Sequence, residues 1–236
     1  MGVVITVSRQ LGSQGSYIAT MAAQTLGFRY LDREVLHRAA EIAGFPDPQM
    51  VRALEEREEV PGLLQRVFDA LGSMPAVPSV PSATMREGGY YADLVNEVVY
   101  QESVAVSNRE RAAANYLDLV RKVISRVADE DNAVVVGRGG QVILARRRNA
   151  FHVRVFASLE TRVRILMARD ELSREAAEQD IRRSDRNRAR YLQRYHDVDW
   201  EDPRLYHLQL NTDLVPVAMG TNAIVAAARW LAESLR

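Results

Sequence analysis

The sequence predicts an α/β protein in which a parallel β-sheet carries helices on both faces. Strand patterns occupy residues 3–7, 133–136 and 151–156, the first two as apolar runs rich in β-branched residues. Helical patterns separate these strands, and glycine-bearing turns follow the first two of them. Strands that alternate with helices in this way pair in parallel, because each crossover helix packs on a face of the sheet.

The N-terminal strand leads into a turn that contains Gly12 and Gly15, and helix-forming residues follow over 17–26. Strand, glycine-bearing turn and helix together form the context in which a loop binds phosphate. The backbone N–H groups of such a turn point inward, and the helix N-terminus adds about half a positive charge. The opening stretch is therefore a candidate phosphate-binding loop.

This loop fits the P-loop pattern Gly-x-x-x-x-Gly-Lys-Ser/Thr only in part. If Ser16 takes the hydroxyl position, Gly15 stands in place of the lysine, and Gln14 and Arg9 stand where the pattern has glycines. Lys122 is the only lysine of the chain and lies far along it, so we expect an arginine to supply the cation for this loop. Spacing alone also allows an ordinary glycine-rich turn between a strand and a helix.

A short strand over 28–31 and a helix over 33–43 are predicted next. Gly27 suits the position just past the end of the first helix, and Asp32 suits the N-cap of the second. Asp32 also follows a strand, at the edge of the sheet where open α/β proteins bind ligands. The two roles are compatible, so Asp32 is both a predicted cap and a candidate binding residue.

Residues 46–131 differ in character from the segments on either side and predict a helical insertion between two parts of the sheet. Helical patterns cover 63–71 and 93–129, and a Pro/Ser-rich stretch over 72–82 is the best candidate for a mobile loop. The helix over 93–129 carries an apolar stripe, which can pack on the core or equally bury a dimer face. A homodimer is therefore one expected arrangement.

The strand over 133–136 ends in a Gly-Arg-Gly-Gly turn that contains Arg138. An arginine among glycines at a strand end is a candidate phosphate ligand, and the alternative is a surface arginine in a flexible turn. A helix over 141–145 and a strand over 151–156 follow. Within that strand, we expect His152 to lie on a half-exposed face rather than to act as a catalyst.

Ser158 and Ser173 are the predicted N-caps of two consecutive helices, the second of which is rich in arginine. Between Ile181 and Arg194, its arginines are Arg182, Arg183, Arg186, Arg188, Arg190 and Arg194. One acid, Asp185, accompanies them. Like charges on one helix repel, so we expect an anion such as a phosphate chain to be their partner in a mobile lid. The alternative is a solvated arginine face.

The remaining predicted elements are a turn-rich connection over 195–203, a strand over 205–210 and an amphipathic helix over 217–235. Asn211 and Thr212 follow the end of that strand. Asn211 and Thr212 are therefore two more residues that follow the end of a predicted strand.

Composition narrows the classes of function. The 236 residues are 47% hydrophobic, enough for one core or for a core with a mobile lid. The 31 basic residues balance the 31 acidic ones, which argues against a general nucleic-acid or membrane binder. The chain has no cysteine, its four histidines show no metal-ligand spacing, and no apolar run approaches the ~20 residues that span a bilayer. No N-terminal signal is visible, so we expect a cytoplasmic protein.

Five motifs occur in the order seen in cytidylate kinases. They are residues 9–15, Tyr30-Leu31-Asp32, Val136-Gly137-Arg138-Gly139, Asp185-Arg186-x-Arg188 and Asn211-Thr212. The opening Ile5-Thr6-Val7-Ser8-Arg9-Gln10-Leu11-Gly12-Ser13 resembles the Ile-Thr-x-Ser-Arg-x-x-Gly-Ser start that is frequent in the cytidylate kinase-like family. The resemblance covers about the first 45 residues and residues 133–215, whereas the middle of the chain matches only in position.

This resemblance implies a P-loop NTPase fold of the nucleoside monophosphate kinase type. Its core would comprise residues 1–45 and 132–236, with an arginine-rich lid at about 170–200. Residues 46–131 would form a helical acceptor-binding insertion.

The resemblance also implies phosphoryl transfer from ATP, with Mg²⁺, to a nucleoside monophosphate such as CMP or dCMP. The residues expected around the ATP phosphates are Gly12, Ser13, Gln14, Gly15 and Ser16, with Ser16 near Mg²⁺. The residues expected on the acceptor side are Asp32 and Arg138, and those expected near the adenine are Asn211 and Thr212. The expected catalytic arginines are Arg9, Arg138, Arg182, Arg186 and Arg188.

The chain departs from cytidylate kinases at two positions. Those enzymes carry a P-loop lysine and an aspartate after the Gly-Arg pair, where this chain has Gly15 and Gly139. Phosphoryl transfer depends mainly on positioning and charge neutralisation, so arginines together with a metal ion can suffice chemically. Because the chain has a single lysine, we hypothesise that Arg9 replaces the lysine of the loop. Two alternatives stay open: a catalytically weak nucleotide-binding regulatory protein, and a kinase for a non-nucleotide acceptor.

Overall fold

The computed structural model describes residues 2–32, 35–36, 39, 63–77 and 106–236. In this part of the chain, five strands form one sheet in the order β2-β3-β1-β4-β5, and every neighbouring pair is parallel. The strands are β1 Val4–Arg9, β2 Arg29–Leu31, β3 Ala133–Val136, β4 Ala150–Phe156 and β5 Leu208–Asn211. The predicted parallel α/β fold is confirmed.

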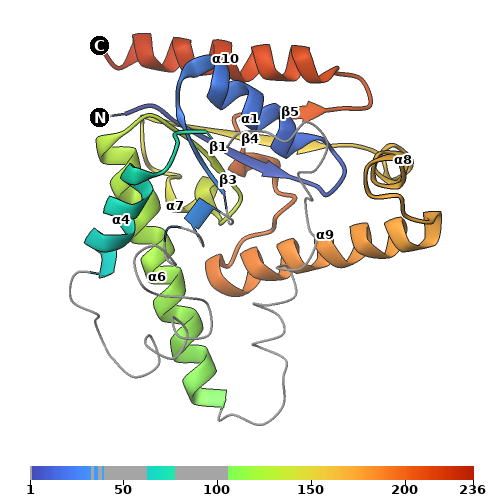
Figure 1. The fold of residues 1–236 in the computed structure, drawn as a ribbon, viewed down its shortest axis with the longest axis horizontal. Helices are drawn as coiled ribbons and strands as arrows, with labels where there is room; N and C mark the ends of the chain where they lie inside the picture. The colour runs from blue at the N-terminus through green and yellow to red at the C-terminus, as the bar shows by residue number, and fades with distance from the viewer. Residues whose placement is uncertain (1, 33–34, 37–38, 40–62, 78–105) are drawn as a thin grey trace.

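Two groups of helices enclose the sheet (Figure 1). One face packs against α1 (Gly15–Leu26) and α10 (Val217–Ser234). The other face packs against α4 (Leu63–Ser73), α6 (Val106–Glu130) and the short helix α7 (Gly140–Ile143). Central parallel strands covered on both faces need apolar side chains in both directions, which explains the continuous runs in β1 and β3.

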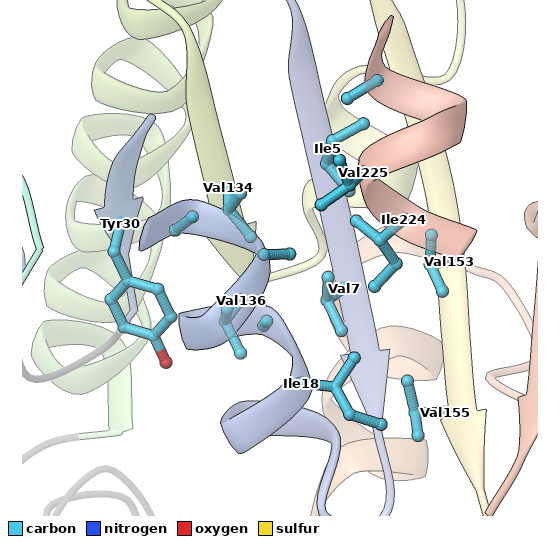
Figure 2. Close-up of a cluster of buried hydrophobic side chains, with 14 of the residues drawn as sticks. Ile5, Val7, Ile18, Tyr30, Val134, Val136, Val153, Val155, Ile224 and Val225 are labelled. Atoms are coloured by element: carbon cyan, nitrogen blue, oxygen red, sulfur yellow. The ribbon is translucent and has the colours of Figure 1, made fainter. Parts of the chain in front are cut away.

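Figure 2 shows the apolar layer between the sheet and the pair α1 and α10. Ile5 and Val7 of β1 lie at its centre and are completely buried. Ile18 of α1 and Ile224 of α10 reach down to the sheet from the helices and are equally buried. This layer fixes α1 on the sheet, and with it the loop that joins β1 to α1.

Ser158 and Ser173 are helix caps, as predicted. Ser158 Oγ accepts a hydrogen bond from the N–H of Thr161 at the start of α8 (Leu159–Asp170). Ser173 Oγ accepts one from the N–H of Ala176 at the start of α9 (Arg174–His196).

The connection after α9 differs from the prediction. The helix continues to His196, and a single 3₁₀ turn, Pro203–Leu205, occupies the first residue of the predicted strand. Asp202 caps this turn by accepting the N–H of Arg204 at 2.9 Å, and a proline suits the first position of such a turn. Strand β5 therefore begins at Leu208.

Much of the predicted insertion lies outside the described residues. Helix α4 confirms the prediction over 63–71, and α6 covers the second part of the helix predicted over 93–129. Residues 78–82 of the Pro/Ser-rich stretch, and most of the helix predicted over 33–43, are not described. The domain boundaries and the dimer face stay predictions. None of the described helices is both long and apolar enough to cross a membrane.

The predicted exposure of His152 is wrong, because the residue is buried rather than half-exposed, with 3% of its surface accessible. Its Nδ1 lies 2.8 Å from the hydroxyl of Thr6 on the neighbouring strand, and its ring stacks on His207 with centroids 4.8 Å apart. Burial, with a smaller effect of His207, lowers the pKa of His152 to about 4.

We expect this histidine to make the protein less stable at acid pH. The pKa of His152 is lower in the folded chain than its ordinary value of 6.5, so the unfolded chain binds the proton first. The stabilisation is complete above pH 6.5 and is lost as the pH falls towards 4, by about 3 kcal/mol for one site. Urea unfolding at a series of pH values measures this, and His152→Asn should flatten the profile over that interval. An unchanged profile in the variant would contradict the assignment.

Candidate functional site

The predicted site residues outside the arginine-rich helix lie at one edge of the sheet, where the parallel strands end. Arg9 is the last residue of β1, Asp32 follows β2, and Asn211 is the last residue of β5. The turn that contains Arg138 begins directly after β3, which pairs with β1. Residues separated by up to about 200 positions in the chain are thereby brought to the edge where α/β proteins bind ligands.

The loop between β1 and α1 has the backbone of a tight turn that opens a helix. Gly12 has a φ of 80° and Gln14 a φ of 60°, both in the left-handed region. Helix α1 begins at Gly15, two residues earlier than predicted, so its N-terminus lies at the loop itself. The first N–H groups of a helix have no partner within it, and the helix dipole is positive there, so this loop suits an anion.

Gly12 is the residue on which the loop conformation depends most. A Cβ at this position would lie 2.6 Å from Leu166 Cδ1 and 2.8 Å from the carbonyl oxygen of Arg162, both in α8. The loop therefore rests directly on α8, and only glycine allows this approach.

Gly12→Ala is expected to destabilise the fold by about 3 kcal/mol, from the left-handed backbone and the clash with α8 combined. Gly27→Ala is the matched control, because Gly27 also has a positive φ (66°) but a Cβ there would meet no other atom within 4 Å. The control should cost only about 1 kcal/mol. Chemical denaturation of both variants measures the difference, and equal losses would contradict the role of the α8 contact.

Ser13 and Thr212 hold the loop in place. The hydroxyl of Ser13 is fully buried and donates to the carbonyl of Gln10 at 2.8 Å and to that of Val155 at 3.3 Å. The hydroxyl of Thr212, beyond the end of β5, donates to the carbonyl of Ser13 at 3.1 Å. These two side chains thus bind backbone, and Ser13 can meet a ligand only through its own main chain.

Arg9 spans the space between this loop and the turn after β3. Its Nε donates to the hydroxyl of Ser16 at 3.2 Å. A Cβ on Gly137 would lie 2.5 Å from Arg9 Nη1, and a Cβ on Gly15 would lie 2.5 Å from Arg9 Cβ. Gly15 therefore makes room for the base of this side chain, and a side chain at position 137 would displace the guanidinium. The arginine head lies beside the loop and the β3 turn together.

The turn after β3 has an unusual backbone. Gly137, Arg138 and Gly139 have φ values of 77°, 57° and 68°, so three consecutive residues are in the left-handed region. For a residue with a side chain, this conformation costs about 1 kcal/mol or more. Strain of this kind at a strand end is a reason to suspect that the arginine is needed there.

The arginine-rich helix α9 is connected to the core through α8. Arg162 of α8 donates to Asp185 Oδ2 at 2.6 Å, with only 8% of the arginine side chain exposed. Arg188 lies 3.8 Å from Asp185 Oδ1 and donates to the hydroxyl of Ser184. The main chain of Arg162 also lies against Gly12. One residue therefore contacts the loop through its backbone and the predicted lid through its side chain.

The expectation that the α9 arginines lack acidic neighbours is only partly right. Arg182 lies 3.7 Å from Glu178, one turn earlier in the helix, and Arg183 pairs with Asp180. Arg182 and Arg186 are exposed, and in the described residues neither has a hydrogen bond or ion pair with the loop. Arg188 therefore lies beside the ion pair of Arg162 and Asp185, whereas Arg182 and Arg186 are exposed.

Asp32 and Asn211 have local roles. Asp32 Oδ1 accepts the N–H of Val35 at 2.9 Å, which confirms the predicted N-cap. Asn211 Oδ1 accepts the N–H of Asp213 at 3.0 Å, and Asp213 in turn accepts the N–H and hydroxyl of Ser158. Both residues still stand at the strand-end edge.

Sequence patterns missed the contacts that join the segment after α9 to β1. Trp200 Nε1 donates to the hydroxyl of Ser8 at 2.8 Å, and the Tyr206 hydroxyl lies 3.4 Å from the same oxygen. Arg154 of β4 is buried and forms an ion pair with Glu201, which belongs to the same segment after α9. A tryptophan within a turn-rich stretch was the only signal for these contacts in the sequence. They place the segment after α9 against Ser8, the residue before Arg9.

His196, the last residue of α9, packs on the β3 turn. A Cβ on Gly139 would lie 2.6 Å from His196 Nε2, so the position before α7 accepts no side chain while the histidine is there. Burial, with a smaller effect of the Arg121 charge, lowers the pKa of His196, which keeps the imidazole neutral near pH 7.

The donor set around Ser16 does not fit the expected Mg²⁺ ion. Because Arg9 Nε donates to Ser16 Oγ, a metal ion on this oxygen would lie roughly 4 Å from a positive charge, a repulsion of about 8 kcal/mol at an effective dielectric constant of about 20. Mg²⁺ prefers carboxylates and water. Among the described residues, no three His, Asp or Glu side chains group so as to hold a metal ion.

Comparison with known proteins gives one family match. A sequence profile of the cytidylate kinase-like family matches residues 4–214. No curated protein sequence matches the chain. An uncharacterized protein from Eubacterium ventriosum ATCC 27560 has a solved structure with a TM-score of 0.56 and 15% identity, over 96% of this chain and 98% of its own.

Two further solved structures have lower TM-scores. TT1252 from Thermus thermophilus has a TM-score of 0.44 and 18% identity, over 96% of this chain and 97% of its own. A shikimate kinase from Bacteroides thetaiotaomicron has a TM-score of 0.43 and 14% identity, over 98% of both chains. At identities this low, the similarity to these structures concerns the fold alone.

Proposed function

We propose that this chain, which belongs to the cytidylate kinase-like family, transfers the γ-phosphoryl group of ATP to a small-molecule acceptor, with CMP and dCMP as the first candidates. The observation that carries the proposal is the position of Arg9. Its head group lies between the loop that suits an anion and the turn that holds Arg138. A cation there can neutralise charge on both sides of a transferring phosphoryl group.

On this proposal, the donor phosphates lie at the N-terminus of α1. The main chain of residues 12–16 would supply the N–H groups, and Ser16 would add its hydroxyl. Arg9 would supply the charge that the lysine supplies in a standard P-loop, with a planar fork that suits two phosphate oxygens. Asn211 and Thr212 would border the nucleoside of the donor, on the β5 side of the loop.

Arg138 and Asp32 would face the acceptor, because they follow the two strands on the other side of β1. Arg188 is held towards the core through Asp185, whereas Arg182 and Arg186 are exposed on α9. The exposed pair would close over the phosphates when both substrates are bound. Transfer itself would then require mainly positioning and charge neutralisation by these arginines.

ADP release with ATP and a panel of nucleoside monophosphates, CMP and dCMP included, tests the proposal. Turnover on one acceptor is expected. Arg138→Gly should abolish most of it while leaving the fold equally stable or about 1 kcal/mol more stable, because glycine relieves the left-handed strain at this position. ATP binding without turnover on any acceptor would instead support the regulatory alternative, which the absence of a cation at Gly15 favours. No ATP binding would mean that the loop is only a turn.

A further inference from the structure

The hydroxyl of Ser16 occupies the position of a metal ligand in the P-loop pattern, yet its neighbour here is a guanidinium. Arg9 Nε donates to Ser16 Oγ at 3.2 Å, and Ser16 is buried, with 5% of its surface accessible. The positive charge therefore lies beside the oxygen that would have to approach a divalent cation.

Arg9 is held at this place by its surroundings. Its side chain lies against the Cα positions of Gly15 on one side and Gly137 on the other, where any Cβ would come within 2.5 Å of it. A side chain packed between two backbone segments has little freedom to swing away and make room for an ion. A guanidinium carries five N–H donors, of which Ser16 accepts one.

The aspartate that cytidylate kinases carry after the Gly-Arg pair, a carboxylate of the kind that Mg²⁺ prefers, has no room at Gly139. This position has a φ of 68°, and His196 Nε2 fills the space in which a side chain would begin. An aspartate there would need both a strained backbone and a displaced His196 ring. The β3 turn therefore has no room for this acid while the His196 ring is in place.

We propose that Arg9 replaces the divalent cation in nucleotide binding, so that the affinity for a nucleoside triphosphate does not depend on Mg²⁺. The proposal rests on the nucleotide site proposed above and adds to it how the triphosphate charge is neutralised. A magnesium ion that enters with ATP would be held by phosphate oxygens and water. The protein would bind the free and the magnesium-bound nucleotide about equally well.

Calorimetric titration of the full chain with ATP, once with Mg²⁺ and once with EDTA, tests this. The wild-type dissociation constants should agree within about threefold. Arg9→Ala should lose about tenfold or more in EDTA, because a charge-assisted contact is lost, and should regain part of the affinity when Mg²⁺ is added. Ser16→Ala should change the affinity by the same factor in both buffers.

The possible outcomes show whether this proposal fails alone or together with the proposed function. A wild-type affinity that falls about tenfold or more in EDTA would overturn the replacement by Arg9, while the ATP site would stand. A Ser16→Ala variant that loses affinity only with Mg²⁺ would overturn it too, because the hydroxyl would then be a metal ligand. An absence of ATP binding in both buffers would overturn the nucleotide site together with this proposal. Circular dichroism confirms that each variant is folded before titration.

Discussion

Arg9→Ala is expected to lower the rate of phosphoryl transfer by about 100-fold or more. The variant removes a charged group that lies beside both the phosphate loop and the β3 turn. Loss of a positioned charge at a transferring phosphoryl group typically costs at least that factor. The measurement is kcat/KM for the acceptor that the panel identifies, with ATP saturating.

Two variants make this result specific. Arg9→Lys keeps the charge but not the planar fork, so it should recover only part of the loss. Arg147→Ala removes an arginine that precedes β4, at the opposite edge of the sheet, where it pairs with Asp129. This control should leave kcat/KM unchanged. If Arg9→Ala retains full activity, the loop receives its charge from elsewhere and the proposed role of Arg9 is wrong.

Breaking the contact between Arg162 and Asp185 is expected to destabilise the protein by about 3 kcal/mol for either single variant, Arg162→Met or Asp185→Asn. The reason is that the arginine side chain is 8% exposed and the aspartate 23%, so each variant leaves a largely buried charge without its partner. The double variant should cost clearly less than the sum of the two, because both members of the close buried pair are then removed together. Urea unfolding of the four proteins completes this double-mutant cycle.

The ion pair of Arg174 and Glu160 is the matched control, since it also joins α9 to α8 but both of its side chains are exposed. Its removal should change stability very little, because exposed charges are already well solvated. Equal effects of the two ion pairs would show that burial is not what gives the Arg162 contact its strength.

The order and type of the described elements could be predicted from local patterns. The buried run in β3 and the caps Ser158 and Ser173 are properties of a few neighbouring residues, and all of them appear where expected. The same holds for Gly27, which ends α1 with a left-handed residue. Boundaries shifted where a proline or a cap competed with a strand pattern, as at the 3₁₀ turn before β5.

The candidate site could be predicted only as a set of residues. Glycines, Arg9 and Arg138 follow strand ends in the sequence, and a parallel sheet must bring its strand ends to one edge. The pattern could not show that Arg9 reaches Ser16 and Gly137, nor that Ser13 is turned inward. The strand alternation in β4 likewise could not reveal that β5 and the segment after α9 would cover His152.

The amino-acid sequence thus specified the parallel sheet, its helices and the residues at the strand ends, because these follow from short-range periodicity and capping. The partners of those residues came from the folded chain. Trp200 meets Ser8 across 192 positions, and Thr212 meets Ser13 across 199. Contacts over such separations depend on how the helices pack on the sheet, and no local pattern in the chain encodes that packing.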